Sequence, residues 1–275
     1  MATRAKKLTE LSGDELNELI GLMGSSDSVE LKVTLPAGAH RATVDALRID
    51  PLEAQIRQVF FFDTPDLQLN KSGIAVRARR IQGRSGDSVV KLRPVVPDQL
   101  PESLRGSASV NVEVDAMPGG YVCSASMKGK VANADVGEAV HGERPLSKVF
   151  TKEQRAFFAE HAPEGLKLRD LSVLGPVFVL KDVIQPRKLG RRLVTEFWLL
   201  PDGTRILELS TKCLPGEAFQ VAVEAKAYLE GLGLNVTADP QTKTKTTLQF
   251  FAKRLAKEAA AQKPAASETE EPVLT

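Results

Sequence analysis

The segment that decides the fold reads Phe61-Phe62-Asp63-Thr64-Pro65-Asp66-Leu67 and, after residues 68–72, Gly73-Ile74-Ala75-Val76-Arg77-Ala78-Arg79. In its second half, apolar residues alternate with arginines, which is the period of a β-strand with one apolar and one charged face. Thr64-Pro65-Asp66 is typical of a turn, because proline fixes φ and aspartate favours turn conformations. The segment therefore predicts two strands joined through a turn.

The same alternation recurs along the chain. Ser28-Val29-Glu30-Leu31-Lys32-Val33-Thr34-Leu35 alternates polar and apolar residues without a break. Further strands are predicted at 54–62, 73–81, 87–93, 109–115, 177–185, 192–200 and 204–212. Helices are predicted at 151–161, 216–232 and 242–261, with a short one near 15–22. The sequence thus predicts an α+β fold with eight strands, in which 94–106 is a loop and 116–142 has no clear assignment.

Composition and charge exclude several classes of protein. Of the 275 residues, 37 are basic and 35 acidic, and the net charge of +2 is too balanced to indicate nucleic-acid binding. The apolar runs fall far short of the roughly 20 residues that span a bilayer, and no secretory signal is recognisable. Cys123 and Cys213 form neither a metal pair nor a disulfide framework. We expect a cytoplasmic protein without membrane association, and nothing in the sequence indicates an oligomeric state.

Charged residues gather on one face of the predicted strands. They are Glu30, Lys32, Arg77, Arg79, Lys91, Arg93, Glu113, Asp115, Glu196, Glu208 and Lys212. A sheet can carry such a face in water, as antiparallel sheets often do. Eight strands can also close into a barrel with the charges inside. Because enclosed charges need partners, that interior would suit a polyanion held by the bases and a hard cation, Mg²⁺ or Mn²⁺, held by the carboxylates.

These motifs resemble the CYTH superfamily, the triphosphate tunnel metalloenzymes. Residues 61–79 are similar to its signature, and Ser28-Val29-Glu30-Leu31-Lys32 stands where the family carries a Glu-x-Glu-x-Lys motif. Further similar motifs are Lys91-Leu92-Arg93, Val112-Glu113-Val114, Glu208-Leu209-Ser210 and Thr242-Lys243-Thr244. The resemblance covers roughly residues 28–115 and 177–251.

The resemblance implies an eight-stranded antiparallel β-barrel, a tunnel with helices packed outside, that binds a triphosphate compound and Mg²⁺ or Mn²⁺. The phosphate ligands would be Lys32, Arg77, Arg79, Lys91, Arg93, Lys181, Lys212 and Lys243. The metal ligands would be Glu30, Glu113, Glu196 and Glu208. Glu113 and Asp115 would be catalytic and orient the attacking water.

The predicted organisation has three parts. Residues 1–27 form a polar N-terminal segment with the short helix. Residues 28–261 form a single tunnel domain with a weakly matched insertion at 116–175. Residues 262–275 contain almost no bulky apolar residue, which predicts a disordered tail.

Two serines depart from the family pattern. Ser28 and Ser210 stand where glutamates are expected, so the metal side has lost carboxylates while the phosphate side is complete. The favoured function is metal-dependent hydrolysis of a triphosphate compound, either inorganic triphosphate or a nucleoside triphosphate. The alternatives are a class IV-like adenylate cyclase and a module that binds a triphosphate or another phosphorylated ligand without turnover.

Overall fold

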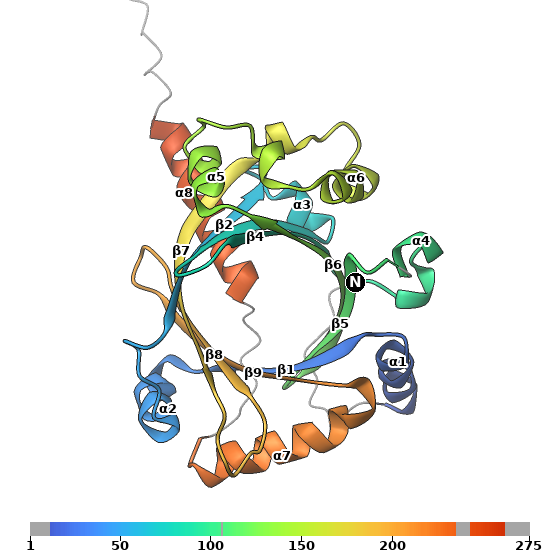
Figure 1. Ribbon diagram of the computed structural model, residues 1–275, viewed down its shortest axis with the longest axis vertical. Helices are drawn as coiled ribbons and strands as arrows, with labels where there is room; N and C mark the ends of the chain where they lie inside the picture. Colours follow the sequence, from blue (N-terminus) through green and yellow to red (C-terminus); the bar gives the residue numbers. More distant parts are fainter. Residues whose placement is uncertain (1–11, 106, 235–242, 262–275) are drawn as a thin grey trace, which may run out of the picture.

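A computed structural model describes residues 12–105, 107–234 and 243–261, which form a closed β-barrel seen end-on in Figure 1. Around the barrel the strands follow one another in the order β1-β5-β6-β4-β3-β2-β7-β8-β9. Their bounds are β1 (Ser28–Leu35), β2 (Gln55–Asp63), β3 (Ile74–Ile81), β4 (Gly86–Leu92), β5 (Val110–Met117), β6 (Gly120–Val131), β7 (Ser172–Ile184), β8 (Leu193–Leu199) and β9 (Arg205–Cys213). The predicted tail at 262–275 lies outside the described residues.

The barrel differs from the predicted eight-stranded antiparallel arrangement, which was wrong in two respects. Strand β6 lies in the segment to which the sequence assigned no structure, and it is inserted between β5 and β4. Strands β1 and β5 run parallel, with Glu30 opposite Asp115, whereas all other neighbours in the barrel pair antiparallel. The second difference follows from the first, because strand directions cannot alternate all the way round a closed ring of nine.

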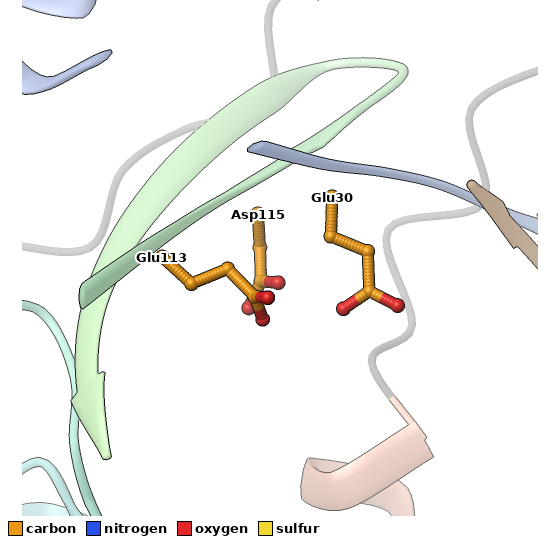
Figure 2. A group of neighbouring side chains, drawn as sticks. All are labelled: Glu30, Glu113 and Asp115. Atoms are coloured by element: carbon orange, nitrogen blue, oxygen red, sulfur yellow. The ribbon is translucent and has the colours of Figure 1, made fainter. Parts of the chain in front are cut away.

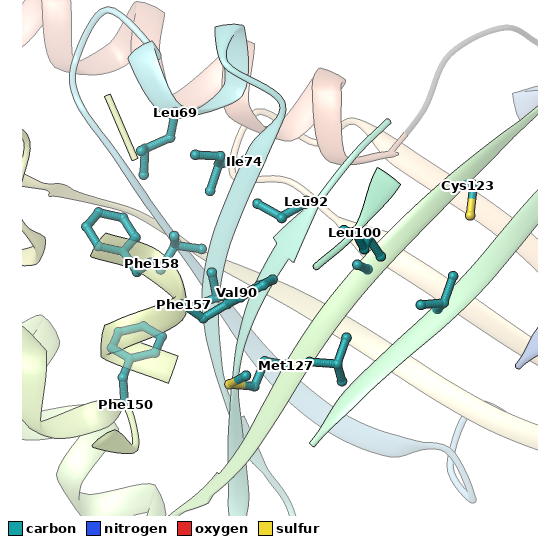
Figure 3. Packing of buried hydrophobic residues seen from close by; sticks show 14 of the residues in the cluster. Leu69, Ile74, Val90, Leu92, Leu100, Cys123, Met127, Phe150, Phe157 and Phe158 are labelled. Atoms are coloured by element: carbon teal, nitrogen blue, oxygen red, sulfur yellow. The ribbon is translucent and has the colours of Figure 1, made fainter. Parts of the chain in front are cut away.

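Helices cover the outer face of the barrel. Their bounds are α1 (Gly13–Gly24), α2 (His40–Leu47), α3 (Gln68–Lys71), α4 (Glu102–Arg105), α5 (Asn133–Val140), α6 (Lys152–His161), α7 (Ala218–Gly231) and α8 (Lys243–Ala261). Phe157 and Phe158 of α6 belong to the same buried cluster as Val90 of β4 (Figure 3). On α7, Leu229 belongs to a second cluster with Leu209 of β9. The apolar halves of the alternating strands therefore face outward.

The helices follow the sequence in part, because α2, α3 and α5 lie where no helix was predicted. Helices α1, α6, α7 and α8 lie where helices are predicted, although residue 242, the first of the last predicted helix, is outside the described residues. The predicted loop at 94–106 contains the one-turn helix α4. No helix in the described ranges has the length and apolar character needed to cross a membrane.

The connection from β2 to β3 is held by a buried carboxylate. Asp63, 2% exposed, accepts hydrogen bonds from the backbone N–H groups of Thr64 at 2.7 Å, Leu69 at 2.9 Å and Asn70 at 3.0 Å. Gly73, which directly precedes β3, has a φ of 74°, and a Cβ there would lie 2.6 Å from the backbone oxygen of Arg93. The Asp-Thr-Pro-Asp segment and its glycine thus serve the fold, and they place the start of the arginine-bearing strand.

Helix α8 packs differently from the other helices. Its Leu248 and Phe251 cluster with Val59, Phe61 and Trp198, residues whose register with Arg77, Arg79 and Lys181 puts them on the same face as the charged side chains. The start of α8 also lies within the ring of strands in Figure 1. Contrary to the expectation that all helices pack outside, α8 therefore covers an apolar part of the interior.

Candidate functional site

The strand register gathers the charged side chains on the interior face of the barrel. Side chains of directly paired residues point to the same side of a sheet. Glu30 pairs with Asp115 on one side and Lys212 on the other, and Glu196 pairs with Glu208. Ion pairs that skip a strand, such as the contact of Lys212 on β9 with Glu113 on β5, are possible only across a concave surface. Since helices cover the opposite face, these side chains point inward.

Three carboxylates form an acidic cluster, which we define as Glu30, Glu113 and Asp115. One oxygen of each lies within 4.8 Å of the others, and Figure 2 shows the three side chains converging. The parallel pairing of β1 with β5 brings them together, because it sets Glu30 beside Asp115 and Ser28 beside Glu113. Carboxylate oxygens are the ligands that hard divalent cations prefer.

Bases surround the acidic cluster. Asp115, whose side chain is fully buried, lies 2.6 Å from the ammonium of Lys32, 3.4 Å from that of Lys91 and 3.6 Å from the guanidinium of Arg93. Lys32 also lies 2.9 Å from Glu30. Each acid in this half of the interior has a basic partner, so the negative charges of the acidic cluster are offset within the chain.

The pKa values follow from this pairing. Burial raises the pKa of Asp115, but Lys32, Lys91 and Arg93 outweigh it and hold that pKa well below the usual range. For Glu30, burial is likewise outweighed by Lys32, and the pKa falls to about 2. Burial also lowers the pKa of Lys91, to about 8, because Asp115 does not fully compensate it. The carboxylates are thus charged at neutral pH, and Lys91 has too little negative charge nearby.

A second group, the basic cluster, consists of Arg57, Arg77, Arg79 and Lys181. Only Arg79 has a close ion pair, through Nε and Nη2 to Asp87 at 2.7 Å and 2.6 Å. Lys181 reaches no nearer than 3.9 Å to Glu196. Among the described residues, no carboxylate lies within ion-pair distance of Arg57 or Arg77. This part of the interior carries more basic than acidic groups.

Arg57 and Arg77 show this imbalance most directly. Arg57 is 5% exposed, and its guanidinium donates to the side-chain oxygen of Gln55 at 3.0 Å and 2.8 Å. Nε of Arg77 is buried without a hydrogen-bond partner. Burial, and then Arg79, lower the pKa of both arginines to about 10, and burial lowers the pKa of Lys181 to about 8. An anion bound among these residues would remove the imbalance.

The third group, the Lys243 group, consists of Lys243, Glu196 and Glu208. The ammonium of Lys243, at the start of α8, lies 2.5 Å from Glu196 and 2.6 Å from Glu208. It also lies 5.0 Å from the centre of the Trp198 ring, whose N–H donates to Glu196 at 3.2 Å. Burial lowers the pKa of Lys243, but the two glutamates outweigh it and raise that pKa above its ordinary value.

Comparisons with known proteins identify the fold. No protein-family model and no curated protein sequence matches the chain. A solved structure from Hippeastrum, described as an adenylyl cyclase candidate with a dominant triphosphatase activity, matches with a TM-score of 0.58 and 16% identity, over 80% of this chain and 95% of its own. A candidate adenylate cyclase from Bacillus halodurans matches with a TM-score of 0.56 and 13% identity, over 80% and 97%. The chain therefore has the same fold as these two solved structures, in agreement with the fold expected from the resemblance to the CYTH superfamily.

Within this fold, every site residue named from the sequence lies in the interior, but in three groups. Lys32, Lys91, Arg93 and Lys212 surround the acidic cluster. Arg77, Arg79 and Lys181 belong to the basic cluster, and Lys243 lies between Glu196 and Glu208. The structure therefore does not bring Glu196 and Glu208 to the other carboxylates named as metal ligands. Of the two serines, Ser28 donates to Glu113 at 3.4 Å, and Ser210 lies opposite Lys32.

The interior charges that were missed from the sequence include Arg57, Asp87 and Lys128. Arg57 shares the alternation of Val59 and Phe61, but its strand reads as apolar. Asp87 lies two alternations before Lys91 in a predicted strand, and that spacing could have identified it. Lys128 lies on β6, for which no strand was predicted, and it faces the interior opposite Val89.

Proposed function

We propose that the barrel interior binds a triphosphate compound together with a divalent cation and hydrolyses its terminal phosphoanhydride bond. The observation that carries the proposal is the basic cluster, in which Arg57 is buried and Arg77 is half-buried, and neither has a carboxylate partner among the described residues. Burying a cation without a partner is costly, and a phosphate chain would supply the missing negative charge. The acidic cluster lies on the same interior face, so one ligand could contact bases from both groups.

The acidic cluster suits a divalent metal. Its three donors are carboxylate oxygens, with the Ser28 hydroxyl beside them, and such a set favours Mg²⁺ or Mn²⁺ over softer metals. A bound cation of this kind would offset charge on the phosphate oxygens during hydrolysis. Since Ser28 and Ser210 replace carboxylates of the superfamily pattern, we expect metal binding to be weaker than with the full motif.

The two carboxylates of β5 differ in their surroundings and take different roles in the proposal. Asp115 is fully buried and contacts Lys32, Lys91 and Arg93, so we assign it the positioning of those bases toward the phosphates. Glu113 is paired only with Lys212, whose side chain is half exposed and can turn toward an anion. One oxygen of Glu113 can then orient a water molecule and accept its proton, while the other remains available to the metal.

The proposed reaction transfers a phosphoryl group to water. The water oxygen forms a bond to the terminal phosphorus, and the bond from that phosphorus to the bridging oxygen breaks. Inorganic triphosphate would give phosphate and pyrophosphate, and the proton of the water passes through Glu113 to solvent. Lys32, Lys91 and Arg93 offset the charge that develops on the leaving group. The triphosphatase activity described for the Hippeastrum protein supports hydrolysis rather than cyclisation.

One assay tests the proposal. Purified protein is incubated with Mg²⁺ or Mn²⁺ and inorganic triphosphate, ATP, GTP or thiamine triphosphate, and phosphate, pyrophosphate and cyclic AMP are measured. We expect phosphate release that Glu30→Gln abolishes and that Glu53→Gln, at an exposed position outside the site, leaves intact. Formation of cyclic AMP with pyrophosphate would assign a cyclase instead. Tight binding of the same compounds without turnover would assign a binding module.

A further inference from the structure

The Lys243 group places two carboxylates in the interior, away from the acidic cluster. Glu196 and Glu208 lie directly opposite each other on β8 and β9. Like charges in that position repel, and both side chains are largely buried, 15% and 10% exposed. Two such carboxylates require a cation between them, and in a metal-binding interior that cation could be a metal ion or a side chain.

We propose that the ammonium of Lys243 is a built-in cation that closes Glu196 and Glu208 to metal, so that the protein binds one divalent cation, at the acidic cluster. This inference rests on the proposed function in one respect only, namely that the acidic cluster binds a metal ion. It gives Lys243 a role as a counter-ion rather than the phosphate ligand expected from the sequence.

The contacts of Lys243 hold its ammonium in place. The distances of 2.5 Å and 2.6 Å put both carboxylates in direct contact with Nζ. The Trp198 ring lies beneath the ammonium, and its N–H orients Glu196. A metal ion at this position would have to displace a side chain that is only 16% exposed.

The helix that carries Lys243 is itself anchored. One and two turns further along α8, Leu248 and Phe251 are 3% and 4% exposed among the apolar interior residues, and Thr247 is fully buried. Moving the ammonium far from the glutamates would therefore require moving α8. The anchoring makes the lysine a fixed part of the barrel interior.

Lys243 offsets the two carboxylates without a metal. Its ammonium contacts both Glu196 and Glu208, and Lys181 of the basic cluster lies 3.9 Å from Glu196. Of the bases near the acidic cluster, Lys32 is as enclosed as Lys243, at 17% exposed, whereas the side chains of Lys91, Arg93 and Lys212 are 21%, 29% and 50% exposed. These last three bases can turn toward a phosphate and make room for a metal at the acidic cluster, whereas Lys243 is the direct cationic partner of both Glu196 and Glu208.

Counting bound Mn²⁺ tests the inference without any activity measurement. Free Mn²⁺ is followed by its electron paramagnetic resonance signal during titration of the full chain. We expect one bound Mn²⁺ in the wild type, two in Lys243→Met, and one again in Lys243→Met/Glu208→Gln. Lys253→Met, at an exposed position of the same helix, serves as the matched control and should bind one.

A second measurement covers the case in which Lys243→Met releases α8. Glu208→Gln in the wild-type background should leave the single Mn²⁺ bound with an affinity within about twofold, because Glu208 is not a ligand. A tenfold loss of Mn²⁺ affinity in Glu208→Gln, or two Mn²⁺ ions in the wild type, would overturn the inference. So would a Lys243→Met protein that keeps its fold and gains no Mn²⁺.

The outcomes separate the inference from the proposed function. No Mn²⁺ in the wild type and one in Lys243→Met would support the built-in cation and contradict the metal site at the acidic cluster. One Mn²⁺ in both proteins, with Lys243→Met folded, would contradict the built-in cation alone. Trp198, the single tryptophan, adds a local signal, because paramagnetic Mn²⁺ bound beside Glu196 should quench its fluorescence in Lys243→Met only.

Discussion

The ammonium of Lys32 lies 2.6 Å from the carboxylate of Asp115, so a base on β1 neutralises a fully buried acid on the parallel strand β5. Lys32 also contacts Glu30, and it thereby joins two of the three carboxylates of the acidic cluster. Without a ligand, the bases proposed to bind phosphate form ion pairs with the carboxylates proposed to bind metal. The same charged groups therefore contribute to the stability of the fold and to ligand binding, and each contribution can be tested.

The acidic cluster should make the fold sensitive to acid. The pKa values of Asp115 and Glu30 are lower in the folded chain than the usual value of about 4 in an unfolded one. Their contribution to stability is present above pH 4 and is lost as the pH falls from about 4 toward 2. We expect the free energy of unfolding in urea to fall steeply in this window, and less steeply in Asp115→Asn. Equal slopes in the two proteins would contradict the pairing, and Glu53→Gln should behave as the wild type.

The basic cluster should have the opposite effect near neutral pH. Burial lowers the pKa of Lys181 to about 8, so below pH 8 its charged form is less favourable in the folded than in the unfolded chain. Lys181→Met should therefore stabilise the ligand-free protein at pH 7, and the gain should shrink between pH 8 and 10 as the wild type releases this proton. Urea unfolding at pH 7 and 9.5 measures it. Cys123 and Cys213 titrate in both the wild type and Lys181→Met, so the difference in unfolding free energy between the two proteins reports on Lys181. Lys188→Met, at an exposed position, should show no such change.

Arg57 should lower the stability of the ligand-free protein and strengthen its binding of triphosphate. Replacing a buried cation without a carboxylate partner by an apolar side chain is expected to raise the melting temperature of the ligand-free protein. The same Arg57→Met variant should bind inorganic triphosphate roughly 10- to 100-fold more weakly, as for a lost charge-assisted hydrogen bond of about 1.5–3 kcal/mol. Calorimetry with and without ligand measures both effects. A variant that is destabilised and binds normally would show that Arg57 serves the fold, and Arg80→Met, on the outer face, is the control.

The carboxylate of Asp63 should matter for stability and not for binding. Asp63→Ala leaves three backbone N–H groups, two of them in buried hydrogen bonds, without their acceptor, and we expect a loss of about 3 kcal/mol in the free energy of unfolding. Asp66→Ala, at an exposed position of the same turn, should cost less than 1 kcal/mol by the same measure, about the value of a single exposed hydrogen bond. At temperatures where Asp63→Ala is folded, its affinity for triphosphate should equal that of the wild type.

The interior face was predictable from sequence where charge alternates with bulky apolar residues. Along β3, Arg77 and Arg79 cannot share a side with Val76, and closure of the barrel fixes which side is inner. Strand β6 shows no such contrast between charged and bulky apolar residues. The small Ala125 points outward, and its neighbours Ser124 and Ser126 point inward. The burial of this strand depends on α6, which approaches so closely that a Cβ on Gly129 would lie 2.6 Å from Gln154.

The division of the carboxylates could not be predicted either. Glu30 and Glu208 look alike in an alternating strand, and their difference arises from elements far away in the chain. The parallel partner β5 gives Glu30 two further carboxylates, whereas the docking of α8 gives Glu208 the ammonium of Lys243. Sequence alternation identifies which side chains face inward, and long-range contacts decide which of them meet.

Lys212 should couple metal binding to phosphate binding. Its ammonium contacts Glu113, and its side chain is half exposed, so it is the base most easily removed from the acidic cluster. Lys212→Met frees Glu113, and we expect Mn²⁺ alone to bind roughly tenfold more tightly, which corresponds to about 1.4 kcal/mol. Inorganic triphosphate should bind more weakly to this variant, since it loses a cation.

The coupling itself provides the decisive comparison. In the wild type, a triphosphate that draws Lys212 away from Glu113 should tighten Mn²⁺ binding, and Mn²⁺ should tighten triphosphate binding by the same factor, as linkage requires. This factor is measured by titrations corrected for the binding of Mn²⁺ to free triphosphate. In Lys212→Met we expect the factor to fall toward one. Lys226→Met on α7, an exposed lysine paired only with Glu230, should keep it. An undiminished factor in Lys212→Met would show that Lys212 does not exchange between Glu113 and the phosphates.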